Sequence, residues 1–247
     1  MMRGWTPDPA WMAYCGTPPE PGGAGWNWDP WLGAALVAGL ALAWRHSADR
    51  RALMAGWLIL SLALVSPLCS LSVALFSARV GQHLVILLAA APLLALGLPA
   101  PRRPATTGAI AAAAAGFAVM LWLWHLPGPY TATFRSDLAY WAMHLSLLGA
   151  AVWLWRALLL AAASRPEAVL PAGLVTAAQM GGLGAFLTFA PRPLFPPHGL
   201  TTLAWGFTPL EDQQLGGLLM WVPGGLAFAG VAVGALVIAM RRERFAA

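Results

Sequence analysis

Residues 80–98 read VGQHLVILLAAAPLLALGL, a stretch whose one ionisable side chain is His83. A helix rises 1.5 Å per residue, so these residues are long enough to cross the roughly 30 Å hydrocarbon core of a bilayer. The whole chain has the same character, with 60% hydrophobic and 9% charged residues. Soluble proteins carry about 25% charged residues. The sequence therefore predicts an integral membrane protein and excludes a soluble globular domain.

Six further apolar stretches predict six more membrane-crossing helices, and prolines or glycines punctuate several of the gaps between them. They lie at residues 31–44, 52–68, 107–124, 138–163, 169–189 and 215–240. The first of them is the shortest. We therefore expect an all-α, polytopic membrane bundle of seven transmembrane helices. An outward N-terminal segment, 1–30, precedes the transmembrane domain, 31–240, and a cytoplasmic tail, 241–247, follows it.

The arginines set the predicted orientation, because the chain contains no lysine. Ten of the fourteen fall on the side that holds the C-terminus: Arg45, Arg50, Arg51, Arg102, Arg103, Arg156, Arg165, Arg241, Arg242 and Arg244. Positively charged loops stay cytoplasmic, so we expect the N-terminus outside and the C-terminus inside. The arginines form short scattered clusters between apolar runs. That pattern is a topology signal, and we expect no nucleic acid as a partner.

This orientation places His83, His125 and His144 at similar depth near the outer side. His83 lies about one turn into its helix, His144 about two turns into its own, and His125 ends the helix 107–124. Ionisable side chains are costly in hydrocarbon and are usually functional there. Imidazole is a ligand for copper, zinc and iron, so we predict a metal site formed by these three residues. The alternative stays open that each histidine is a hydrogen-bonding residue between helices.

Three more outer residues are candidate additional or transient metal ligands: Asp212, Cys69 and Cys15. Asp212 could also hydrogen bond the second ring nitrogen of a ligating histidine. Thiolates favour Cu(I), but two cysteines in an oxidising compartment most simply form a disulfide, and both alternatives stay open. His198, in the loop after residue 189, could be a further ligand, although a surface histidine is the simpler interpretation.

The sequence contains no nucleophile elbow, phosphate-binding loop or pair of catalytic carboxylates, so we expect no enzyme. One alternative to a copper protein is a membrane electron carrier in which paired histidines bind haem b between helices. Another is a metal-free assembly scaffold. A transporter is less favoured, because no discontinuous helix or buried ion-pair relay is evident.

Several unusual sequence blocks, in consistent order from residue 29 onward, resemble the CtaG family of cytochrome c oxidase assembly factors associated with caa-type oxidases. Among them are LALVSPL at 62–68, LWHLP at 123–127, GAFLTFAP at 184–191 and MWVPGG at 220–225. Many family members carry a histidine and a methionine four and three residues before the position of His83. Arg79 and Val80 occupy those places here, which leaves one histidine in this segment.

The resemblance implies a multi-pass protein of the bacterial inner (plasma) membrane that is needed to mature a haem–copper cytochrome c oxidase. It implies oxidase subunits and the lipid bilayer as partners. It also implies delivery of copper, as Cu(I), to the membrane-embedded centre of the oxidase, with a periplasmic copper donor as a further partner.

Overall fold

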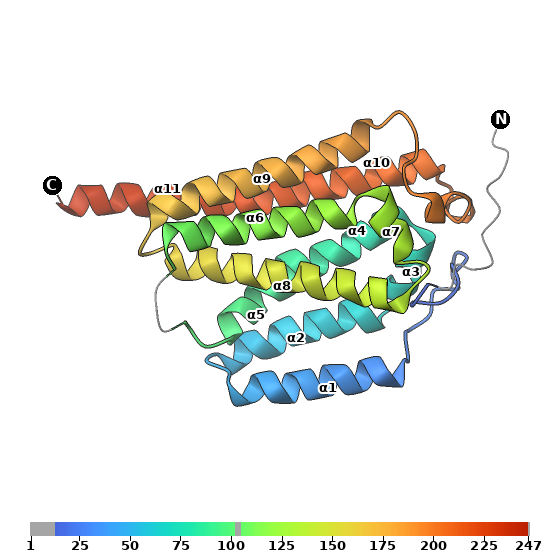
Figure 1. Cartoon of the computed structure of the whole chain (residues 1–247), viewed down its shortest axis with the longest axis horizontal. Helices are drawn as coiled ribbons and strands as arrows, with labels where there is room; N and C mark the ends of the chain where they lie inside the picture. The colour runs from blue at the N-terminus through green and yellow to red at the C-terminus, as the bar shows by residue number, and fades with distance from the viewer. Residues whose placement is uncertain (1–12, 102–104, 247) are drawn as a thin grey trace.

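A computed structural model of the chain describes residues 13–101 and 105–246 as a bundle of helices that lie side by side (Figure 1). The longer helices are α1 (Pro30–Arg45), α2 (Arg50–Val65), α6 (Thr107–Trp124), α8 (Asp137–Ala161), α9 (Pro166–Phe189) and α11 (Gly225–Ala246). The shorter ones are α3 (Leu68–Ala74), α4 (Phe76–Leu84), α5 (Ala91–Gly97), α7 (Pro127–Ala132) and α10 (Pro209–Leu219). Residues 1–12 of the predicted N-terminal segment lie outside the described residues, as do Arg102, Arg103 and residue 247.

Within the described ranges, five helical segments are long and apolar enough to cross a membrane. They are Phe76–Gly97, Thr107–Trp124, Asp137–Ala161, Pro166–Phe189 and Pro209–Arg241. Helices α2 and α3, bent by 47° relative to each other, would together form a sixth. The predicted all-α membrane bundle is therefore confirmed. Helix α1, at 16 residues, is apolar but shorter than each of the five spans.

Prolines interrupt two of these segments. Proline has no N–H to donate to the carbonyl four residues earlier, so the regular hydrogen-bond pattern cannot continue through it. The helix widens into a π-helix at η1 (Val85–Ala90), just before Pro92, and again at η4 (Met220–Gly224), which contains Pro223. Such widened turns are frequent at functional sites, and η1 begins two residues after His83.

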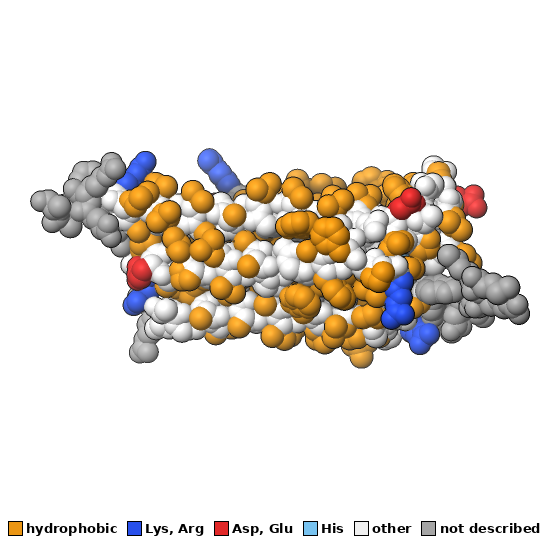
Figure 2. Space-filling view, turned by 90° about the horizontal axis from the view of Figure 1, so that it is seen from above, with side chains coloured by type: hydrophobic (Ala, Val, Ile, Leu, Met, Phe, Trp, Pro, Cys, Tyr) orange, Lys and Arg blue, Asp and Glu red, His pale blue; other side chains and the backbone are white. Residues whose placement is uncertain are grey.

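The outside of the bundle is apolar along its length. Figure 2 shows hydrophobic side chains over the middle of one face and charged side chains gathered toward its two ends. Exposed large apolar residues occur on every long helix, with Val37 of α1 71% exposed and Val233 of α11 59% exposed. Apolar surface of this extent is costly in water and compatible with lipid. The apolar helices and this apolar surface indicate a multi-pass membrane protein.

The two ends of the bundle carry different residues. One end, which we call the histidine end, holds the N-terminal segment 13–29, α3, α7 and the 190–208 loop (Figure 1). That loop contains two short 3-10 turns, η2 (Pro196–His198) and η3 (Leu203–Trp205). The opposite end holds the α1–α2 connection with its arginines and the α8–α9 connection. The three predicted site histidines therefore lie at the other end of the bundle from most of the arginines that the structure describes.

Glycines allow the last two long segments to pack backbone to backbone. A Cβ atom added at Gly184 of α9 would lie 2.7 Å from the carbonyl oxygen of Gly217 and 2.9 Å from the Cβ of Trp221. At Gly216 an added Cβ would lie 2.5 Å from Cδ1 of the Phe76 ring in α4. Small residues near the start of the last span thus permit the close helix contacts that membrane bundles favour.

Substitution of Gly184 by alanine tests this close approach. We expect Gly184→Ala to destabilise the folded protein by about 1–3 kcal/mol, because the added methyl group overlaps backbone atoms that cannot move independently. The measurement is the thermal unfolding midpoint of the protein in detergent. Gly182→Ala, in the same helix, is the matched control, since its Cβ would meet no atom within 4 Å. Equal midpoints for the two variants would show that α9 and α10 are not packed this closely.

Candidate functional site

Three helices bring His83, His125 and His144 together near the histidine end. His83 lies on α4, His125 follows the last residue of α6, and His144 lies on α8. All three are buried, with exposed fractions of 6%, 4% and 5%. The ring centres of His83 and His144 are 5.3 Å apart, and those of His83 and His125 are 6.2 Å apart. We call these three residues the histidine cluster.

Backbone carbonyls fix the protonation of two of these rings. Nδ1–H of His125 donates to the carbonyl oxygen of Leu121 at 2.7 Å, and Nδ1–H of His144 donates to that of Tyr140 at 3.1 Å. A carbonyl oxygen can only accept, so the proton lies on Nδ1 and the lone pair on Nε2 in each neutral ring. A carbonyl partner of this kind is what usually orients a metal-binding histidine.

Several nitrogens of the histidine cluster have no hydrogen-bond partner. They are both ring nitrogens of His83 and Nε2 of His144, and all are buried. Most buried polar groups in proteins are hydrogen bonded, so unpaired ones require an explanation. These atoms are available to a metal ion or to another ligand that enters the cluster.

The spacing of the rings falls in the range that metal ligands adopt. A histidine nitrogen binds such a metal at about 2.0–2.1 Å, so the ring centres of two ligands to one ion lie roughly 5–6.5 Å apart. The rings of His83 and its two neighbours meet edge to face. As the side chains stand, no group of three or more His, Cys, Asp or Glu residues in the described chain could hold a metal ion. Ligation by all three histidines would require the rings to turn.

Arg79 lies one helical turn before His83 and was not predicted from the sequence as part of the site. Its side chain is 2% exposed, and Nη2 donates to Oγ1 of Thr133 at 2.9 Å. The guanidinium carbon also lies 4.4 Å from the ring centre of Phe134 and 5.7 Å from that of Tyr140. Aromatic faces stabilise this buried cation. Residues four apart on a helix share a face, so a fixed positive charge lies beside the histidine cluster.

Asp212, a predicted ligand, belongs to α10, and its carboxylate lies against the start of α4. Its carboxylate accepts hydrogen bonds from the backbone N–H of Phe76 at 2.6 Å and of Ser77 at 3.2 Å, and from the Ser77 hydroxyl. A carboxylate at a helix N-terminus satisfies N–H groups that have no partner within the helix. Asp212 therefore fixes the beginning of the helix that carries His83, and its recorded hydrogen bonds are to residues 76 and 77.

Cys15 and Cys69, also predicted as candidate ligands, form a disulfide in the structure. The Tyr140 hydroxyl lies 3.3 Å from Sγ of Cys15 and 3.8 Å from Sγ of Cys69. The Tyr140 ring packs against that of His144, with 4.2 Å between ring centres. The oxidised pair has no thiolate to offer a metal, but one aromatic side chain connects it to the histidine cluster.

The interpretation of His198 as a surface residue is wrong. Its side chain is 2% exposed, its Nε2 lies 2.6 Å from the Tyr130 hydroxyl, and its ring meets that of Phe134 edge to face. The prediction fails because residues 190–208 fold over the end of the bundle and do not project from it. Burial, together with the nearby Arg79 charge, lowers the pKa of His198 to about 3.

The depressed pKa of His198 makes stability depend on pH. Below pH 6.5 the imidazole of His198 is protonated in the unfolded chain but stays neutral in the folded one. The free energy of unfolding therefore decreases as the pH falls toward 3. Between pH 7 and pH 5 the loss is about 2 kcal/mol. We expect His198→Gln to remove this part of the pH dependence in unfolding of the detergent-solubilised protein. The same loss in wild type and variant would contradict the assignment.

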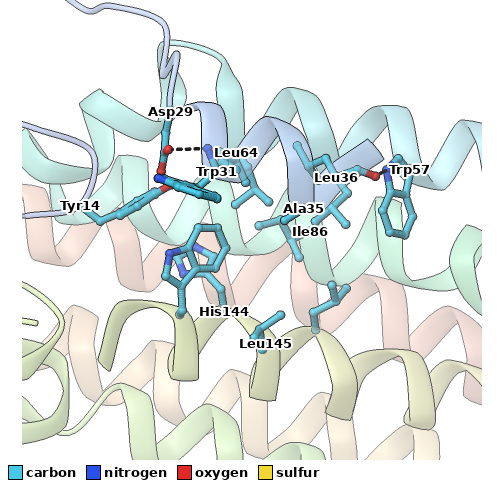
Figure 3. Close-up of a pocket in the computed structure, with 14 residues that line it drawn as sticks. Tyr14, Asp29, Trp31, Ala35, Leu36, Trp57, Leu64, Ile86, His144 and Leu145 are labelled. Atoms are coloured by element: carbon cyan, nitrogen blue, oxygen red, sulfur yellow. Dashed lines mark hydrogen bonds between the residues drawn. The ribbon is translucent and has the colours of Figure 1, made fainter. Parts of the chain in front are cut away.

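A pocket of about 440 Å³ reaches the histidine cluster between α1, α2 and α8, and its walls are mostly apolar (Figure 3). His144 lines its inner side, while Tyr14, Asp29 and Trp31 lie toward the histidine end. The Tyr14 hydroxyl donates to the carboxylate of Asp29, which also accepts from the Trp31 N–H at 2.8 Å. The hydrogen bond from Tyr14 lowers the pKa of Asp29. The N-terminal segment thus closes one end of a pocket that leads to a candidate ligand.

A protein-family model covers most of the chain. The family model described as cytochrome c oxidase caa3 assembly factor (Caa3_CtaG) matches residues 34–243, which include the whole histidine cluster. No curated protein and no solved structure shows a significant match to the chain.

Proposed function

The chain belongs to the cytochrome c oxidase caa3 assembly factor family, and on this premise we propose that it binds Cu(I) near its outer face and delivers it to the oxidase. The site that we propose consists of His83, His125 and His144. The recipient is a membrane-embedded oxidase subunit docked alongside, and a periplasmic donor supplies the copper. The role is non-catalytic, and the protein resides in the bacterial inner membrane.

One observation carries this proposal: three separate helices place buried imidazoles side by side, and three of their ring nitrogens lack any partner. A histidine that only connects helices would donate or accept a hydrogen bond across the interface. His83 does neither. A small turn of the rings toward a common point would give a metal the nitrogen ligands that are now unpaired.

The surrounding charge favours a monovalent ion. The histidines are neutral when they act as ligands, and the recorded hydrogen bonds of Asp212 are to the start of α4, away from the cluster. Arg79 adds a positive charge on the same helix face as His83. Repulsion between charges scales with their product, so a divalent ion is opposed twice as strongly as Cu(I) at the same distance. Imidazole is a suitable ligand for copper.

Asp212 and the cysteines have supporting roles in this proposal. Asp212 positions His83 by holding the first turn of α4. Cys15 and Cys69 act as transient ligands only after their disulfide is reduced, because the thiolate is the form that binds Cu(I).

Metal analysis of the purified protein tests the histidine site. After incubation with Cu(I) and reductant in detergent, we expect wild type to retain copper. A His83→Ala/His125→Ala/His144→Ala variant should lose at least about 90% of it, because removal of ligands lowers affinity by orders of magnitude. His46→Ala is the matched control, since His46 is exposed at the opposite end of the bundle, and it should retain wild-type copper. Equal copper in wild type and triple variant would refute the proposed site.

A visible spectrum of the same preparations separates the alternatives. Bound haem b would give a strong Soret band, which Cu(I) does not. A metal-free scaffold would bind neither, and the triple variant would then lose folded protein without any change in copper per molecule. Size-exclusion elution of each variant as a single species establishes that folding is retained.

We also propose seven spans, with α1 as the first, the N-terminus outside and the C-terminus inside. Most of the arginines within the described ranges lie at the end opposite the histidine end, and positive residues stay cytoplasmic. A disulfide at the histidine end suits an oxidising compartment. Together these observations support placing the histidine end outside.

Reporter fusions test this topology. A green fluorescent protein joined after residue 247 should fluoresce, because it folds in the cytoplasm. Alkaline phosphatase joined after residue 129, at the histidine end, should be active, whereas the same enzyme joined after residue 99 should be inactive. The reverse pattern of phosphatase activity would invert the proposed orientation and place the histidine cluster on the cytoplasmic side.

A further inference from the structure

The two sulfurs of the Cys15–Cys69 disulfide lie in different surroundings. Cys15 is half-buried and lines a pocket of about 260 Å³ whose other walls include Thr17, Asn27 and Ser70. Cys69 is fully buried, with 0% exposed area, on α3. A reagent that enters the pocket from outside the bundle would therefore meet the Cys15 sulfur first.

We propose that this disulfide undergoes exchange with an external thiol, with Sγ of Cys15 as the atom attacked and Sγ of Cys69 as the leaving group. An incoming thiolate forms a new S–S bond to Cys15 while the Cys15–Cys69 bond breaks, and the electron pair leaves on Cys69 as a thiolate. A second thiol of the reductant then attacks the mixed disulfide and releases Cys15. Two electrons pass from the dithiol, which becomes a disulfide, to the cysteine pair.

Two hydrogen-bond donors surround the proposed leaving group. The side-chain amide of Asn27 donates to Sγ of Cys69 at 3.7 Å. The Tyr140 hydroxyl lies 3.8 Å from the same sulfur and 3.3 Å from Sγ of Cys15, and once the S–S bond breaks the Cys69 thiolate is the stronger acceptor of the two. Hydrogen bonds to a charged group favour the charged form, so both donors stabilise a thiolate at Cys69. A sulfur that leaves as a stabilised thiolate leaves faster. The burial of Cys69 protects its sulfur from direct attack, while Asn27 and Tyr140 stabilise the thiolate that forms when the disulfide breaks.

Reduction would loosen the segment that covers the histidine cluster. Tyr14, the neighbour of Cys15, stacks on Tyr140 with ring centres 4.8 Å apart and packs edge to face on Trp141 at 5.0 Å. Without the disulfide, this part of the segment is held by side-chain packing and by a few hydrogen bonds, including Trp205 Nε1 to the Pro19 carbonyl. The exchange is thus a control point for access to His144 through the pocket that Tyr14 lines.

Mixed-disulfide mapping on metal-free wild type tests the inference without dependence on copper. The full chain in detergent is exposed briefly to glutathione. A parallel sample is exposed to a CxxC dithiol protein whose second cysteine is replaced by serine, which traps the adduct. After acid quenching and alkylation, peptide mass spectrometry locates the adduct. We expect at least a tenfold excess on Cys15 over Cys69.

The position of the adduct and the thiol that forms it decide between the outcomes. An adduct on Cys15 with either thiol supports the inference, and the thiol that reacts identifies a small-molecule or a protein source. Equal adducts on both cysteines, an adduct on Cys69, or reaction only after denaturation would overturn it. Because no metal is added, failure of the copper site and failure of this exchange are separate results.

A pair of tyrosine variants tests the role of the Tyr140 hydroxyl. Tyr140→Phe keeps the ring that packs on His144 but removes the donor beside Cys69, so reduction by the same thiol should slow about tenfold. Tyr130→Phe is the matched control, because its hydroxyl contacts His198 and neither sulfur. Equal reduction rates for the two variants would overturn the role assigned to the Tyr140 hydroxyl, while the adduct mapping decides which sulfur is attacked.

Discussion

A polar group buried in a membrane protein must find its partner within the protein, because the hydrocarbon offers no water. This constraint explains the helical fold and most of the polar side chains inside it. Asp212 satisfies the first N–H groups of α4, and Nδ1 of His125 and His144 uses carbonyls of its own helix. Against that background, a few buried polar atoms of the described chain have no partner, and His83 is the residue with two of them. These two nitrogens lie where three helices converge, which gives the cluster its functional interest.

The sequence predicted the helical framework well because hydrophobic length is a strong signal. Each predicted apolar stretch corresponds to a helical segment, although only five of these segments, or six with the bent α2–α3 pair, are long and apolar enough to cross a membrane. The alternating direction of these segments brings His83, His125 and His144 to one end. The bends and widened turns within the helices were harder to predict from the sequence. The bend between α2 and α3 at Pro67 and the widened turn before Pro92 depend on single prolines inside apolar runs. Such runs contain no periodic pattern that would reveal where a helix bends.

The contacts around the site could not be predicted, because they depend on loops that fold back over the bundle. His198 sits in a stretch rich in proline and glycine that gives no sign of burial, yet it contacts Tyr130. No role in the site was predicted for Arg79, and only the folded chain reveals its aromatic neighbours. Asp212 was expected near the metal but binds the backbone at residue 76, more than a hundred positions earlier. In each case the partner lies on a different helix or loop.

The fixed cation at Arg79 affects how tightly the proposed site would hold a metal ion. A permanent positive charge beside the ligands lowers the affinity for any metal ion below that of a similar site without it. An intermediate in a relay needs this moderation, because a metal moves onward only when each successive holder binds it more tightly. In the copper delivery that we propose, this weaker retention would favour transfer from the cluster to a recipient that binds the ion more tightly, so that copper is handed forward and does not accumulate.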